Sequence, residues 1–297
     1  EISCSLVGSE MCIRDRDKPI VMTSEKEEPG AWGGIHICGR AHTNAEGGKG
    51  SSEIGGAVYG GNDDADNSGT LQYIRLEYTG FAFDEEHEAN GISFYGVGNG
   101  TIVDHCQAYK GSDDGFEFFG GSVNVSNLVA VSCSDDSFDW TEGWNGKGTN
   151  LVAYQEAEST LGYDCDCLME CDNNGSNNAA TPVAHPVLKN LILVGNGGSK
   201  QGIRLRAGTE VEIDNAKVCG KGQPLTVETA LTENALKNGT SKLTNITLTS
   251  ELSSKEGIYT HADFIAVTSN KVDANLSYSS FEDIRKECSW MNGSWVK

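Results

Sequence analysis

Two segments of this chain, 22 residues apart, have almost the same sequence. The first is Asp113-Asp114-Gly115-Phe116-Glu117-Phe118 and the second is Asp135-Asp136-Ser137-Phe138-Asp139-Trp140. In each, an acidic turn precedes an alternating strand, and a second apolar strand follows. A period of about 20–50 residues is typical of stacked structural units rather than of a closed globule. The repeat therefore predicts a solenoid in which equivalent side chains of successive coils are aligned.

The rest of the chain consists of short apolar strands separated by Gly, Asn and Asp. An asparagine stands directly before an apolar strand at five positions, namely Asn127, Asn150, Asn190, Asn215 and Asn245. Such an asparagine tolerates a left-handed backbone at a coil corner, or stacks its amide on the neighbouring coil. The pattern predicts an all-β, right-handed parallel β-helix, a single solenoid with coils of roughly 22–25 residues and loops inserted at 156–167 and 173–187. The alternative, an antiparallel β-sandwich, would have hairpin turns every 8–12 residues or so and no long period.

Several motifs of the chain also resemble a known group of proteins. The segments that carry the resemblance are 17–24, 31–35, 66–71, 113–117 with Gly120-Gly121, and 202–208. They resemble secreted bacterial β-helix proteins, which are similar in architecture to the pectate-lyase-like superfamily. The resemblance extends over about residues 17–222. It implies the fold and a secreted or cell-surface location, but no particular activity.

The two ends of the chain are expected to differ from its centre. Residues 5–16 resemble translated read-through of a sequencing adapter, so residues 1–16 are expected to be a non-native leader that replaces the targeting segment. Residues 17–222 are predicted to form the β-helix. Residues 223–297 are predicted to add further coils and a terminal cap, with short helices near 228–240 and 279–288.

The composition limits the kinds of partner. Forty-three acidic residues against 22 basic ones give a formal net charge of −21, which disfavours binding to nucleic acid. No apolar run approaches the ~18 residues that a membrane helix requires. The acid excess suits divalent cations, or simply solubility. The source organism and the oligomeric state are left open.

The cysteines were expected to indicate the redox compartment. Of the ten, Cys4 and Cys12 fall in the expected leader, and the spacing of the other eight does not favour zinc. Disulfides formed in an oxidising compartment are the expectation, with their connectivity open. Cys106 and Cys133 are expected to be either stacked core thiols or a disulfide.

Aligning the coils predicts two columns of outward-facing side chains. The first contains Ser93, Glu117, Asp139, Glu170 and Arg204, and the second contains Tyr95, Phe119, Thr141, Asp172 and Arg206. Carboxylates on strands about 4.8 Å apart repel unless a cation, a shared proton or an arginine lies nearby. Glu117, Asp139, Glu170 and Asp172 are therefore candidate ligands for Ca²⁺, which prefers oxygen. The alternative is a solvated acidic face balanced by Arg204 and Arg206.

Two other groups of residues are candidate sites. Asp64 and Asp66 belong to an Asp-x-Asp-x-Ser-Gly sequence, which is either the first half of a calcium loop or an Asx-rich turn. Tyr95, Phe119 and Trp144 are candidates for an aromatic platform on which sugar rings stack.

These features predict an extracellular or cell-surface protein with a binding or structural role, associated with glycans and stabilised by Ca²⁺. One alternative is a Ca²⁺-dependent polysaccharide lyase, in which Arg204 or Arg206 removes the proton beside a uronate carboxylate. Another is a structural unit of an adhesin or filament. The sequence favours a role other than catalysis, and it does not specify the ligand.

Overall fold

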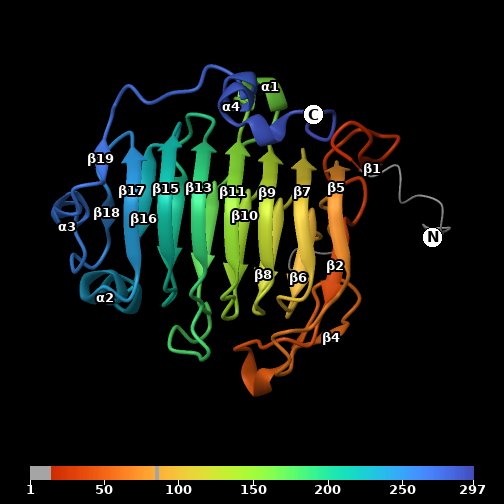
Figure 1. The fold of residues 1–297 in the computed structure, drawn as a ribbon, viewed down its shortest axis with the longest axis horizontal. Helices are drawn as coiled ribbons and strands as arrows, with labels where there is room; N and C mark the ends of the chain where they lie inside the picture. The colour runs from red at the N-terminus through yellow and green to blue at the C-terminus, as the bar shows by residue number, and fades with distance from the viewer. Residues whose placement is uncertain (1–14, 84–86) are drawn as a thin grey trace.

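The computed structural model describes residues 15–83 and 87–297 and shows a right-handed parallel β-helix (Figure 1). The longer wall is a nine-stranded sheet in which every strand pairs in parallel with its neighbours. Its strands, in order, are β1 (Ile20–Met22), β5 (Thr70–Glu77), β7 (Ile102–Tyr109), β9 (Asn124–Val131), β11 (Lys147–Tyr154), β13 (Val187–Val194), β15 (Glu212–Cys219), β17 (Lys242–Leu248) and β19 (Lys271–Val272).

The second wall is an eight-stranded parallel sheet, and each of its strands alternates along the chain with a strand of the first wall. Its strands are β2 (Ile35–Cys38), β6 (Ile92–Tyr95), β8 (Phe116–Phe119), β10 (Phe138–Thr141), β12 (Met169–Asp172), β14 (Gln201–Arg206), β16 (Gln223–Val227) and β18 (Ser253–Ser254). A small antiparallel hairpin, β3 (Gly50–Ser51) with β4 (Val58–Tyr59), lies in an inserted loop. The predicted parallel β-helix is confirmed.

Helices are short and occur in the connections and near the end of the chain. They are α1 (Glu158–Leu161), α2 (Ala230–Asn238), α3 (His261–Ala266) and α4 (Phe281–Glu287), with 3-10 turns at Glu46–Gly48 and Ser289–Met291. The helices expected near 228–240 and 279–288 correspond to α2 and α4. Coils continue across residue 222, because β16 pairs with β14 and β17 pairs with β15.

The recurrent asparagines form a ladder along the nine-stranded sheet. Asn127, Asn150, Asn190 and Asn215 all have φ between 56° and 65°, a left-handed conformation that asparagine tolerates better than most residues. Each amide also donates to the previous one, with N···O distances of 2.8 Å from Asn150 to Asn127, 3.0 Å from Asn190 to Asn150 and 2.8 Å from Asn215 to Asn190. Both expected roles are therefore present in the same residues. Asn245 departs from the ladder and donates to Asp214 instead.

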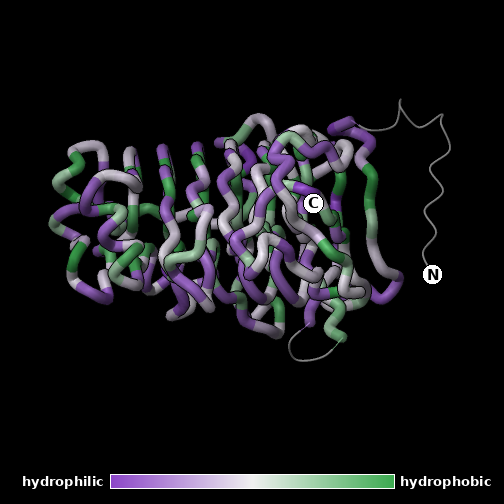
Figure 2. Tube along the Cα trace, turned by 90° about the horizontal axis from the view of Figure 1, so that it is seen from below, coloured by the Kyte–Doolittle hydropathy of each residue, from purple (hydrophilic) through white to green (hydrophobic). Residues whose placement is uncertain are grey.

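The core lies between the two sheets and contains the inward-facing residues of each coil. In Figure 2, short hydrophobic and hydrophilic stretches alternate along the tube. Phe116 stacks on Phe138 with ring centroids 5.5 Å apart, and Phe118 stacks on Trp144 at 4.1 Å. Trp140 is buried beside them, as expected from its phase. Each such side chain contributes roughly 1.5–3 kcal/mol by leaving water, so the repeated aromatic positions hold neighbouring coils in register.

The register of the outward column agrees with the prediction. Glu117 pairs with Ser93 on one side and with Asp139 on the other. Asp139 pairs with Glu170, and Glu170 pairs with Arg204. The insertion between β10 and β12 therefore does not shift the column, and three acidic side chains follow one another on adjacent strands.

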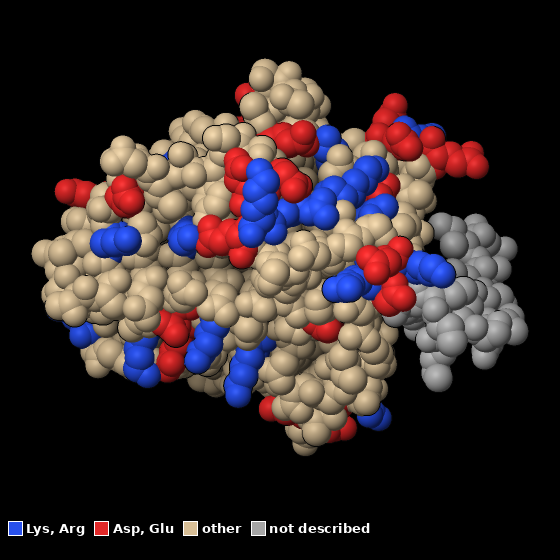
Figure 3. Space-filling view, turned by 45° about the horizontal axis from the view of Figure 1, so that its top comes forward, with Lys and Arg blue, Asp and Glu red and all other residues tan. Residues whose placement is uncertain are grey.

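The C-terminal segment returns along the outer face of the nine-stranded sheet. Figure 1 shows it running from β19 past α4 to the region of β1 and β5. Ile284, Met291 and Trp295 pack on outward apolar side chains of the sheet such as Val129 and Ile192. Figure 3 shows lysines and arginines beside acids of opposite sign on this side of the molecule, with much uncharged surface between them.

The expected disulfides are not found among the described residues, where all eight cysteines are free. The parallel register explains this for the expected pair, because it places Cys106 beside Ile74 and Leu128 rather than beside another cysteine. Cys106 and Cys133 are buried core thiols. Most of the expected leader, including Cys4 and Cys12, lies outside the described residues.

Candidate metal centre

Three successive coils carry acidic side chains at the same positions. The segments 113–117 and 135–139 are the two copies seen in the sequence, and the pairing of Asp139 with Glu170 identifies a third, Asp166-Cys167-Leu168-Met169-Glu170. This copy keeps its first and last acids but has cysteine in place of the second aspartate. It lies 31 residues after the second copy, because a loop containing α1 is inserted. We call these segments the three acidic coils.

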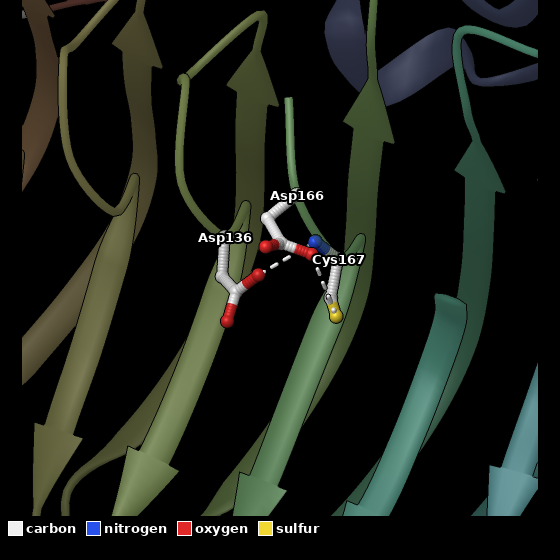
Figure 4. A group of neighbouring side chains, drawn as sticks. All are labelled: Asp136, Asp166 and Cys167. Atoms are coloured by element: carbon white, nitrogen blue, oxygen red, sulfur yellow. Dashed lines mark hydrogen bonds between the residues drawn. The ribbon is translucent and has the colours of Figure 1, made fainter. Parts of the chain in front are cut away.

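Backbone hydrogen bonds fix the acidic turns to one another. The Asp136 N–H donates to Asp114 Oδ1 at 2.9 Å, and the Cys167 N–H donates to Asp136 Oδ1 at 2.6 Å. In Figure 4, Asp136 and Asp166 point toward Cys167 from the turns before β10 and β12. One aspartate in each turn thus positions the next coil and still has a second oxygen for another partner.

The side chains of the three acidic coils line a cleft of about 430 Å³, here called the acidic cleft. Its lining residues are Glu53, Glu88, Asn90, Asp113, Asp114, Glu117, Asp135, Asp136, Asp139, Asp166, Glu170 and Arg204. Sequence reasoning missed Glu53, Glu88, Asn90 and Asp166. Asn90 and Asp166 occupy repeat positions and could have been found by aligning the coils, whereas Glu53 comes from the β3–β4 insertion.

Basic side chains close one end of the acidic cleft. Arg204 Nη1 lies 2.9 Å from Glu170 Oε1, and Arg206 Nη2 lies 2.6 Å from Glu170 Oε2. Lys200 pairs with Asp166 in the same way. The third acidic coil is therefore largely neutralised by the coil that follows it.

The first two acidic coils have no such neutralisation. Within the described chain, no lysine or arginine forms an ion pair with their six acids, which are Asp113, Asp114, Glu117, Asp135, Asp136 and Asp139. Asn90 donates to Glu117, but its own Oδ1 is buried without a hydrogen-bond donor. Asp139 Oδ1 is likewise buried and without a donor. Unpaired buried oxygens cost free energy unless a partner binds them.

The electrostatics of the acidic cleft disfavour the charged forms of its acids. Loss of hydration, and then the charges of Asp135 and other neighbours, raise the pKa of Asp113 to about 7. The more exposed Asp135 has its pKa raised less, to about 6. Burial and neighbouring carboxylates raise the pKa values of Asp114, Glu117, Asp136 and Asp139 well above the usual value. A cation within the cleft would remove this penalty.

Several groups of these side chains are arranged so that they could hold a metal ion. In each group the candidate ligand atoms lie within 4.8 Å of one another. The groups made of carboxylates alone are Asp113–Asp114–Asp135, Asp114–Glu117–Asp139 and Asp136–Asp139–Glu170. A fourth group contains Asp136, Asp166 and Cys167, but burial raises the pKa of the Cys167 thiol and keeps it protonated. The oxygen-only groups suit hard divalent cations.

The structure separates the other predicted metal ligands from this centre. Asp172 is bound by Arg206 at 2.7 Å, so its charge is already balanced. Asp64 accepts a hydrogen bond from His42 at 2.7 Å, and Asp66 pairs with Arg40 at 2.7 Å. Neither Asp64 nor Asp66 belongs to a metal-holding group among the described residues. These contacts favour the Asx-rich turn over the half calcium loop among the two alternatives for this sequence.

The expected aromatic platform is wrong, because its rings are buried. Tyr95, Phe119 and Trp144 expose 0%, 8% and 1% of their surfaces. Tyr95 and Phe119 do face outward, but Tyr59 of the β3–β4 hairpin packs on Tyr95 with ring centroids 5.1 Å apart. Trp144 belongs to the core between the sheets. An inserted loop thus covers the surface that the register alone would have left open.

The two arginines considered as catalytic bases are held as cations. Burial alone would lower the pKa of Arg204, but its hydrogen bond to Glu228 and the charge of Glu170 outweigh that effect and raise it. Burial would likewise lower the pKa of Arg206, but its hydrogen bond to Asp172 and the charge of Asp172 raise it. This environment works against proton removal by either side chain.

The comparison with protein families gives one match. A family model described as "Pectate-lyase like beta helix domain" matches residues 8–296. The chain belongs to this family. Its pectate-lyase-like β-helix domain includes all the coils described above and the C-terminal return segment. No curated protein and no solved structure matches this domain. Among the described residues, no helix has the length and apolar character needed to cross a membrane.

Proposed function

We propose that this protein binds Ca²⁺ in the acidic cleft and acts outside the cell as a glycan-associated binding or structural protein. The observation that carries the proposal is the set of six clustered acids in the first two acidic coils, none of which forms an ion pair with a lysine or arginine among the described residues. The buried Asn90 Oδ1, which has no donor, adds a neutral oxygen of the kind that Ca²⁺ accepts.

Calcium is the favoured ion because the cleft is wide and rich in oxygen. Ca²⁺ takes about 6–8 oxygen ligands in flexible geometry, whereas Mg²⁺ requires a compact octahedron and retains water. Extracellular calcium sites have dissociation constants of about 10⁻⁴–10⁻³ M and are filled in calcium-rich surroundings, so even a weak site in this cleft would be occupied outside the cell. The glycan part of the proposal is supported by the family alone.

Calorimetric melting tests the cation. The protein is melted with CaCl₂, with a chelator, and with NaCl at matched ionic strength, since simple screening also relieves repulsion. Ca²⁺ at 100 times its dissociation constant would stabilise the fold by about 2.7 kcal/mol, seen as a rise of several degrees over the NaCl sample. Equal melting temperatures in CaCl₂ and in the matched NaCl would overturn the proposal.

A Ca²⁺-dependent polysaccharide lyase is the second candidate, since the family has this architecture. Arg204 lines the acidic cleft, but the ion pairs that raise its pKa work against this side chain as the base. The test is incubation with pectin, alginate and glycosaminoglycans in CaCl₂, followed by ultraviolet absorbance of unsaturated ends. Titration calorimetry with the same polysaccharides tests glycan binding without cleavage. The adhesin or filament alternative gains no support, because the column of Glu117, Asp139 and Glu170 lies in one cleft.

A further inference from the structure

Two of the metal-holding groups share one residue. Asp139 belongs to the group with Asp114 and Glu117, and also to the group with Asp136 and Glu170. The two groups lie on opposite sides of Asp139 along the solenoid, because Glu117 and Glu170 are its neighbours on the adjacent strands. Asp139 is therefore the central member of a five-carboxylate array.

The hydrogen bonding of Asp139 differs from that of its neighbours. Asp114 and Asp136 each accept a backbone N–H, Glu117 accepts the Asn90 amide, and Glu170 is bound by two arginines. Asp139 accepts no hydrogen bond from the described residues, and its Oδ1 is buried. Both of its oxygens remain available, so this carboxylate can contact one cation on each side.

The charge of the array also requires more than one ion. The five carboxylates carry a formal charge of −5 when ionised. Among the described residues, the basic side chains that form ion pairs with them are Arg204 and Arg206, both on Glu170. A single divalent cation held by Asp114, Glu117 and Asp139 would leave Asp136 without a bound positive charge. Like charges on strands about 4.8 Å apart repel strongly where water is partly excluded.

We propose that the acidic cleft holds two divalent cations bridged by Asp139, an inference that rests on the proposed cation binding. The first ion is held by Asp114, Glu117 and Asp139, with the Asn90 amide oxygen beside them. The second is held by Asp136, Asp139 and Glu170. The first site binds more tightly, because none of its carboxylates is shared with an arginine, whereas Glu170 is shared with two.

The stoichiometry of Ca²⁺ binding tests this inference. Titration calorimetry with CaCl₂ and elemental analysis after dialysis are applied to the wild type, Glu117→Gln, Glu170→Gln and Asp139→Asn. Asp64→Asn is the matched control, since it removes an acid outside the cleft. Far-ultraviolet circular dichroism in chelator confirms that each variant is folded. Glu117→Gln and Asp139→Asn each remove a repelling charge, whereas Glu170→Gln also removes the ion-pair partner of Arg204 and Arg206.

The expected result is two bound ions for the wild type and for Asp64→Asn, and one bound ion for Glu117→Gln and for Glu170→Gln. In Asp139→Asn, both sites are expected to lose at least tenfold in affinity. One ion in the wild type overturns the bridged pair and leaves the proposed function intact. Two ions that both persist in Asp139→Asn overturn the bridging role. No bound ion at all overturns the proposed function together with this inference.

Discussion

Asp139 lies beside Glu117 on adjacent parallel strands, and neither carboxylate pairs with a lysine or arginine of the described chain. The aromatic neighbours of these acids, Phe116 and Phe138, stack within the core and set this alignment. The packing that stabilises the coils thus brings like charges together. The metal-free protein is expected to be less stable than its core would allow.

Replacing Asp139 by Asn should stabilise the metal-free protein. The substitution removes a charge that has no partner and keeps the shape of the side chain, so a gain on the order of 1 kcal/mol is expected. Melting in chelator measures it. The control is Asp64→Asn, which loses a hydrogen bond to His42 and should not stabilise the fold. A lower melting temperature for Asp139→Asn would show that its charge is compensated.

The stability of the metal-free protein should fall as pH rises. Asp113 has a pKa of about 7 in the folded chain against an ordinary value of 3.8, and Asp135 has one of about 6. Because the folded state binds more protons than the unfolded state between these values, the stability contributed by Asp113 and Asp135 is fully present below about pH 4 and is lost as the pH rises through about 7. Denaturant titration in chelator at several pH values checks the slope. A rise in stability over this range would contradict the raised pKa values.

The asparagine ladder should contribute through two separable effects. Asn190→Ala loses both the amide hydrogen bonds and the residue type that tolerates φ of 60°, with an expected cost of about 2–3 kcal/mol. Asn190→Gly keeps the backbone conformation and loses only the amide, so it should cost less. Denaturant midpoints of the two variants measure the difference. Equal costs would mean that the left-handed backbone contributes nothing.

The stacked aromatics should account for a large part of the stability of the central coils. Phe138→Ala removes a side chain that is 1% exposed and stacked on Phe116, and it should cost about 3–5 kcal/mol. Phe83→Ala, at a position 65% exposed, serves as the control and should change stability by less than about 0.5 kcal/mol. Urea denaturation followed by circular dichroism separates the two. A small effect of Phe138→Ala would indicate that the core relaxes around the cavity.

Trp295→Ala should weaken the contact between the C-terminal segment and the first coils. The indole is buried and lies 5.1 Å from the His105 ring and 6.4 Å from the Tyr73 ring, between centroids. Hydrogen exchange should become faster in β5 and β7 than in β17, which contributes no residue to the apolar cluster around Trp295. Uniform exchange changes along the solenoid would indicate global destabilisation instead.

Much of the fold could be predicted from the sequence because its signals are periodic. The repeat that pairs Phe116 with Phe138 also pairs Glu117 with Asp139, so one alignment gave both the core and the acidic column. The predicted position of Glu170 in the acidic column is confirmed despite the insertion before β12. Glu170 follows the inward-facing Met169 just as Glu117 follows the inward-facing Phe116.

The features that could not be predicted involve residues outside the periodic pattern, or side-chain conformations that the pattern does not specify. The β3–β4 hairpin covers Tyr95 and Phe119 with Tyr59, and no periodic signal places that loop. The column alignment placed Arg204 beside Glu170 and Arg206 beside Asp172. It could not show that Arg206 contacts both Glu170 and Asp172, because this depends on side-chain rotamers. Glu170 of the third acidic coil was predicted, but Asp166 was missed because Cys167 replaces the second aspartate of the repeat.

The return of the C-terminal segment changes how the solenoid should unfold. In a stack whose coils contact only their neighbours, either end can fray without disturbing the rest. Here α4 is tied to β15 by the ion pair of Lys217 with Glu287, while Lys297 reaches Glu77 of β5. Fraying at the first coil must therefore also detach a segment anchored five strands away in the same sheet. An open stack with its two ends connected in this way is expected to lose its coils together rather than one by one.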